Sequence, residues 1–261
     1  MLYYIFTIVF CLLTIIVLKF GFNIKLKNIK KIKELGYDKN LNNIANKFPA
    51  NKEICESILE KLDNKTVKIE ENTESKASLY IAATNKIIIA NIKDTFTRIQ
   101  TIAHECLHSV QNRKILLFNF IFSNIYILYF IISLILILFN VGKEYFNIYI
   151  QVYVLLTLIY IGIRMYLENE AMSKAIYVAK EYMEEYKNSQ NLKQEEKNNS
   201  KKIEIKDEDI NKLVKGFDEI NKIGIPFTNF YLITLCLLKI IILCIIALIW
   251  PDFGQIFLNL F

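Results

Sequence analysis

The sequence predicts a mostly α-helical membrane protein, with four transmembrane helices and a small cytoplasmic α+β part. Hydrophobic residues make up 54% of the 261 residues, and the mean hydropathy of +0.30 is high for a soluble globular chain. These residues are concentrated in long apolar runs that lysine-rich polar segments separate. The uneven distribution favours a membrane protein with a modest aqueous part.

Four runs are long and apolar enough to cross a bilayer. At 1.5 Å rise per residue, each can cross a hydrocarbon core about 30 Å thick. The first run has no charge before Lys19, and it lacks the basic start and the cleavage site of a signal peptide, so it predicts an uncleaved anchor. The four predicted spans are residues 1–20, 115–140, 146–167 and 230–250.

The polar segment after the first span is predicted to hold most of the α+β part. Residues 40–63 favour helix, which Pro49 interrupts, and residues 67–69 favour a short strand. The runs SLYIAA (78–83) and KIIIAN (86–91) predict a β-hairpin around Thr84 and Asn85. A helix over TFTRIQTIAHECLHSVQ should follow this hairpin.

The polar segment between the third and fourth spans also favours helix. We expect the third span to continue as a helix to about Lys187, and residues 188–209 to form a charged linker. A short amphipathic helix should follow this linker, and Gly224 and Pro226 should end it.

The distribution of lysine and arginine predicts how the chain crosses the membrane, because cytoplasmic loops are enriched in these residues. The basic residues that flank the spans are Lys25, Lys27, Lys30, Lys31, Lys33, Arg113, Lys114, Arg164, Lys212, Lys215 and Lys222. Segments 21–114 and 168–229 are therefore predicted to be cytoplasmic. The amino terminus, the loop 141–145 and the tail 251–261 are predicted to lie outside a cell membrane that the chain crosses several times.

Charge and cysteine content exclude several classes of protein. The net charge is +6, but the arginines are not clustered and no zinc-finger pattern is present, which argues against a nucleic-acid partner. The five cysteines are odd in number and form no CxxC pair. A disulfide framework and a thiolate zinc site are therefore excluded.

The strongest functional signal is AHECLH, which contains the only two histidines of the sequence. His104 and His108 are four residues apart, so on a helix both rings lie on one face and can bind one ion at about 2.0–2.1 Å. Glu105 follows the first histidine and is placed to take a proton from a water molecule and pass it to a leaving amine. This HExxH pattern predicts a zinc site with hydrolytic chemistry.

A catalytic zinc site needs a third protein ligand. No further histidine is present and the cysteines are badly placed, so the third ligand should be a carboxylate. Glu168 and Glu170 in RMYLENEAMSKA are the best candidates, because the second and third spans form an antiparallel pair that returns the chain to the side of the motif.

These motifs resemble those of the YugP-like membrane zinc metallopeptidases and, more distantly, of the HtpX-type peptidases and CAAX prenyl proteases. AHECLHSVQ (103–111) is similar to that family's AHExxHAxQ, and ENEAMSKA (168–175) is similar to its ExxA helix. An anchor before the motif and two spans after it also match. The resemblance implies a zincin-like fold of the gluzincin type, with His104, His108 and Glu168 as zinc ligands and Glu105 as the base.

One position departs from this resemblance. Related membrane peptidases usually carry Asp or Ser directly after the alanine of ExxA, where it supports a ligand histidine, and this chain has Met172. Either Glu170 or Ser173 takes that part, or the register of the third ligand is shifted. The residue that would stabilise an oxyanion is also open, with Arg164, Tyr166 and Lys174 as alternatives.

The hairpin allows two interpretations. In such enzymes an edge strand beside the motif helix binds an extended substrate. Here that strand would be Tyr80, Ile81, Ala82 and Ala83. Alternatively, the hairpin only shields the motif helix.

The sequence thus predicts a membrane-embedded zinc endopeptidase that acts on membrane-proximal segments or membrane proteins at the cytoplasmic face. One alternative is a zinc-binding but inactive membrane scaffold or regulator. Another is a structural or transport protein with an accidental motif. The best feature of this last alternative would be Lys239, near the middle of the fourth span. More simply, this lysine faces the interior of the helix bundle and contacts backbone carbonyls, or reaches toward an interface.

Overall fold

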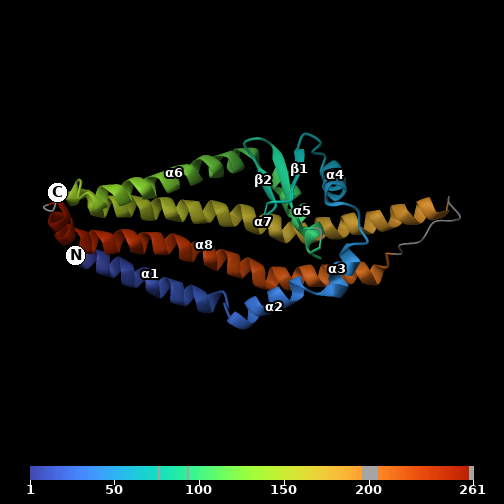
Figure 1. Ribbon diagram of the computed structural model, residues 1–261, viewed down its shortest axis with the longest axis horizontal. Helices are drawn as coiled ribbons and strands as arrows, with labels where there is room; N and C mark the ends of the chain where they lie inside the picture. The colour runs from blue at the N-terminus through green and yellow to red at the C-terminus, as the bar shows by residue number, and fades with distance from the viewer. Residues whose placement is uncertain (76, 93, 196–204, 259–261) are drawn as a thin grey trace. The chain divides into compact units, whose positions relative to one another are not determined.

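The computed structural model describes residues 1–75, 77–92, 94–195 and 205–258 (Figure 1). Most of these residues are helical, and three short strands form one small sheet. The elements are α1 (Leu2–Gly21), α2 (Leu26–Gly36), α3 (Lys39–Ala45), α4 (Asn51–Lys61), β1 (Lys68–Asn72), β2 (Leu79–Ile81), β3 (Lys86–Ala90), α5 (Arg98–Val110), α6 (Arg113–Leu138), the 3₁₀ turn Lys143–Tyr145, α7 (Phe146–Glu195) and α8 (Asp207–Leu258).

The chain divides into two compact units. The first contains Met1–Ile24, Phe118–Tyr166 and the chain from Pro226 onward, and the second contains Lys25–Leu117 and Leu167–Ile225. Within the described residues, α1, α6, α7 and α8 are long and apolar enough to cross a membrane. The prediction of four long apolar helices is confirmed.

The core of the first unit combines aliphatic side chains with a group of stacked aromatic rings. The rings of Tyr126 and Tyr153 lie 5.0 Å apart at an angle of 10°, and both side chains are buried. Lys239 of α8 places its Nζ atom 5.0 Å from the ring centroid of Tyr126 and 5.8 Å from that of Phe130. Its charge therefore lies against two aromatic faces inside the bundle. The simpler interpretation placed Lys239 in the bundle interior, as found, but expected backbone carbonyls as its partners where the structure shows aromatic rings.

The second unit contains the sheet, with strand order β1-β3-β2. Strands β2 and β3 pair in antiparallel fashion, so the predicted hairpin is confirmed, and β1 adds to β3 in parallel. Ile87 and Ile89 of the central strand are fully buried. They pack into a core that also contains Ile58 of α4 and Ile102 of α5.

A row of alanines on α7 brings this helix close to the same core. Ala171, Ala175 and Ala179 are fully buried and are spaced four residues apart, so they lie on one face of α7. Glu168 precedes Ala171 by three residues and shares that face. The small side chains let α7 approach closely, and this carries Glu168 toward the core helices.

Some predicted boundaries are wrong. The lysine-rich stretch after the first span forms a helix, α2, which was not predicted. Helix α7 continues past Lys187 to Glu195, so the predicted linker begins too early, and residues 196–204 lie outside the described part of the chain. The predicted break at Pro49 is confirmed, because it lies between α3 and α4.

Helix α8 also passes through Gly224 and Pro226, where the sequence predicts an end. A proline inside a helix removes one backbone hydrogen bond and costs about 3 kcal/mol. Phe217 before Pro226 and Cys236 after it are both buried, so packing on either side outweighs this local cost.

Candidate metal centre

Helix α5 carries the HExxH motif and is held firmly by its apolar face. Ile99, Ile102 and Cys106 are fully buried on that face. His104 and His108 lie on the other side and are partly exposed, with side-chain exposures of 18% and 11%. The motif histidines thus border the surface of the second unit, while the helix that presents them is anchored in its core.

The histidines converge with the carboxylate of Glu168. The Nε2 atoms of His104 and His108 are 3.1 Å apart, and Oε2 of Glu168 is 3.5 Å from the first and 3.6 Å from the second. Ligands of a tetrahedral zinc ion at about 2.0–2.1 Å lie about 3.3–3.4 Å from one another. Two imidazoles and one carboxylate at these separations fit such an ion, so the donor set and its geometry agree.

Glu170, the alternative third ligand, occupies a different place. Its Oε1 atom accepts a hydrogen bond from Lys174 (2.7 Å), and its Oε2 atom accepts one from Gln111 (3.0 Å). Oε1 of Gln111 lies 2.8 Å from Nδ1 of His108. Glu170 therefore supports a histidine through Gln111, whereas Ser173 is exposed.

Met172 takes part in a different contact, through its backbone carbonyl oxygen. The Asn221 side chain donates a hydrogen bond to the Met172 carbonyl oxygen (2.9 Å) and accepts one from Gln100 (2.8 Å). This pair of buried amides joins α5, α7 and α8 within the second unit. Sequence reasoning missed both amides, and only their place at buried helix positions could have indicated them.

Glu105 is more deeply buried than the two histidines. Its side chain is 6% exposed, and this burial raises the pKa of the carboxyl above its usual range. The neighbouring histidines and a hydrogen bond from the Tyr80 backbone lower the pKa in part. For His108, burial lowers the pKa, but the nearby Glu168 carboxylate and the contact with Gln111 outweigh it and the net pKa is raised.

Strand β2 lies at an edge of the sheet and contacts α5 through the Tyr80 backbone. The strand is shorter than predicted. Tyr80 and Ile81 belong to it, but Ala82 and Ala83 lie in the turn to β3. The turn occupies residues 82–85 because Asn85 adopts a left-handed backbone conformation (φ 48°) before the strand resumes. Substrate binding by this strand stays a prediction.

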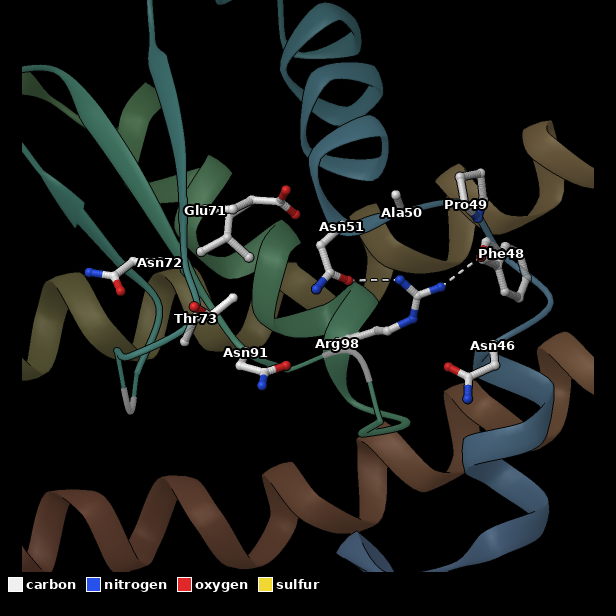
Figure 2. A pocket seen from close by; sticks show the side chains of 12 residues that line it. Asn46, Phe48, Pro49, Ala50, Asn51, Glu71, Asn72, Thr73, Asn91 and Arg98 are labelled. Carbon is white, nitrogen blue, oxygen red and sulfur yellow. Dashed lines mark hydrogen bonds between the residues drawn. The ribbon is translucent and has the colours of Figure 1, made fainter.

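A separate pocket of about 500 Å³ lies where β1 and β3 end and where α4 and α5 begin (Figure 2). Neither the histidines nor Glu168 lines it. Its wall includes Arg98, which is 2% exposed and donates to Oδ1 of Asn51 (2.7 Å) and to the carbonyl oxygens of Phe48 (2.7 Å) and Ala45 (3.0 Å). Arg98 thus fastens the connection between α3 and α4 to the start of the motif helix.

Comparisons of the chain with protein-family models, with curated proteins and with solved structures find no match. Function is therefore inferred from the side chains of this chain and their arrangement.

Proposed function

We propose that this chain is a membrane-embedded zinc endopeptidase of the gluzincin type, similar to the YugP-like peptidases that its motifs resemble. The observation that carries the proposal is the convergence of His104, His108 and Glu168 at separations that suit one zinc ion, with Glu105 next to a ligand. Its substrates are membrane-proximal segments or membrane proteins, cleaved at the cytoplasmic face of the cell membrane.

The membrane part of the proposal is supported by the exposure of apolar side chains on the long helices. Phe6, Leu128 and Leu158 are 70%, 57% and 63% exposed. Similar residues continue along α1, α6, α7 and α8. Soluble monomers rarely expose large continuous apolar areas, and lipid would cover them without cost.

Each site residue has a defined task in this reaction. His104, His108 and Glu168 would hold a zinc ion, which would supply a Lewis acid for the scissile carbonyl and lower the pKa of water. Glu105 takes a proton from the attacking water and gives it to the departing amine. Burial raises the pKa of Glu105 and brings it closer to the range in which a carboxylate works as a general base near neutral pH.

Zinc content of the detergent-purified full chain tests the site. We expect about one zinc per chain in the wild type and little or none in His104→Ala and Glu168→Gln, because a site with two ligands binds zinc weakly. Glu184→Gln is the matched control, since Glu184 is exposed on the same helix and contacts Lys180. All four proteins should elute as one sharp peak in gel filtration.

Two outcomes would count against the proposal. Wild-type protein without zinc after zinc has been supplied would contradict the metal centre. Zinc binding without hydrolysis of test membrane substrates would favour the alternative of an inactive zinc-binding scaffold or regulator.

The predicted sidedness can be tested by cysteine labelling in intact cells. The five native cysteines are buried, so introduced cysteines give the signal. A membrane-impermeant maleimide should label Glu144→Cys directly, but Lys27→Cys only after permeabilisation, because the lysine-rich segment is predicted to be cytoplasmic. Both positions are exposed. The reverse pattern would place the candidate site outside the cell.

A further inference from the structure

We propose that Gln111 is a positioning residue of the metal centre, which fixes the proton of His108 and ties this histidine to the α7 segment around Glu168. The inference rests on the proposed zinc site and extends it beyond the three ligands. Three hydrogen bonds of one side-chain amide carry it.

The orientation of the Gln111 amide follows from its partners. One end lies 2.9 Å from the Leu167 carbonyl oxygen and 3.0 Å from Oε2 of Glu170. Both partners are acceptors, so this end must be the NH₂ group, which donates two hydrogen bonds. The other end, Oε1, must therefore be the oxygen, and it lies 2.8 Å from Nδ1 of His108.

This orientation determines the tautomer of His108. An amide oxygen only accepts hydrogen bonds, so Nδ1 of His108 carries the proton. A neutral imidazole with its proton on Nδ1 has its lone pair on Nε2. Nε2 is the atom that faces His104 and Glu168. Gln111 thus leaves Nε2 unprotonated, and Nε2 is the atom that a metal ion would bind.

Gln111 also links the two helices that supply the ligands. It follows the last residue of α5, and its extended backbone (φ −63°, ψ 162°) ends that helix. Its NH₂ group contacts Leu167 and Glu170, which flank Glu168 on α7. The Gln111 side chain therefore holds both His108 of α5 and the α7 segment around Glu168 in position. Outer partners of this kind tune the orientation and basicity of metal ligands.

Metal affinity of the full chain tests the proposal. Gln111→Met removes both the acceptor and the donors at nearly constant length, and we expect zinc affinity to fall about 10- to 100-fold. The double variant Gln111→Glu with Glu170→Gln exchanges carboxylate and amide, and restores an acceptor for His108 together with a hydrogen bond between positions 111 and 170. It should recover part of the affinity, because a carboxylate at position 111 still cannot donate to the Leu167 carbonyl oxygen, whereas Gln111→Glu alone also places two carboxylates face to face.

A second readout needs no metal. In a His104→Gln background the chain has one histidine, so its ring ¹⁵N signals report the tautomer of His108 directly. At a pH at which the ring is neutral, the signals should show the Nδ1-protonated form with Gln111 present and a shift toward the Nε2-protonated form in Gln111→Met. Gln100→Met is the control, because Gln100 is a buried amide on the same helix whose side chain donates a hydrogen bond to Asn221.

The outcomes separate the two proposals. A wild-type chain that binds no zinc would overturn the proposed function and, with it, a role of Gln111 in metal binding. Normal zinc binding in the wild type and an unchanged affinity in Gln111→Met would overturn only the role of Gln111. An equal loss of affinity in Gln100→Met would also overturn it, since the effect would then reflect general packing.

Discussion

Replacing Glu105 by glutamine is expected to lower the turnover of a membrane substrate by about 10²- to 10⁴-fold, which is the usual contribution of a general base. Glutamine has the same shape and can still accept the hydrogen bond from the Tyr80 backbone, but it cannot take up a proton. Zinc content should remain at the wild-type level, because Glu105 is not among the three converging ligands. Turnover per bound zinc is the quantity to measure.

The same substitution should not weaken the fold. Burial raises the folded-state pKa of Glu105 above its unfolded value, so folding disfavours the ionised carboxylate at neutral pH. A neutral amide removes that cost, and the metal-free variant should unfold at the same temperature as the wild type or higher. Glu184→Gln controls for the loss of one negative charge. Wild-type turnover in Glu105→Gln would assign the proton transfers to another group.

The long helices could be predicted from the sequence because each depends on a local run of apolar residues. The hairpin was predictable for the same reason, since β2 and β3 are neighbours in the chain. The parallel pairing of β1 with β3 was not predictable, because it joins strands that are not consecutive. The predicted helix end at Pro226 was wrong. The local preference of proline favours an end, but the packing of α8 on both sides of this residue outweighs it.

In the candidate site, too, local sequence patterns predict some residues, whereas others depend on how distant segments pack. His104, Glu105 and His108 follow from helical spacing alone, and Glu168 follows from two spans that return the chain to the same side. The surrounding amides do not follow from spacing. Gln111 and Leu167 are 56 residues apart, and Gln100 and Asn221 are 121 apart, so their contacts depend on how the helices pack. Gln111 lies within the quoted AHECLHSVQ motif, but the motif alone does not say what its side chain contacts.

Arg98→Met is expected to destabilise the second unit by about 3 kcal/mol, because hydrogen bonds to a charged group each contribute about 1.5–3 kcal/mol and part of this is offset when a buried charge is removed. Methionine fills a similar volume but donates no hydrogen bond. It leaves the carbonyl oxygens of Ala45 and Phe48 and the amide oxygen of Asn51 without the donor that now joins them. Thermal unfolding of the purified chain measures the loss.

Arg98→Lys distinguishes hydrogen bonding from charge. Lysine keeps the positive charge, but its single ammonium group cannot reproduce the planar fork that reaches three acceptors on two segments, so its stability should lie between those of Arg98→Met and the wild type. Lys52→Met is the control, since Lys52 is exposed on α4 and its contact with Glu56 is 3.9 Å long; we expect a change of less than about 0.5 kcal/mol. If Arg98→Met unfolded at the same temperature as the wild type, the connection between α3 and α4 would be held by apolar packing alone. Zinc content of folded Arg98→Met should stay normal, because Arg98 acts at the start of α5 and touches none of the metal ligands.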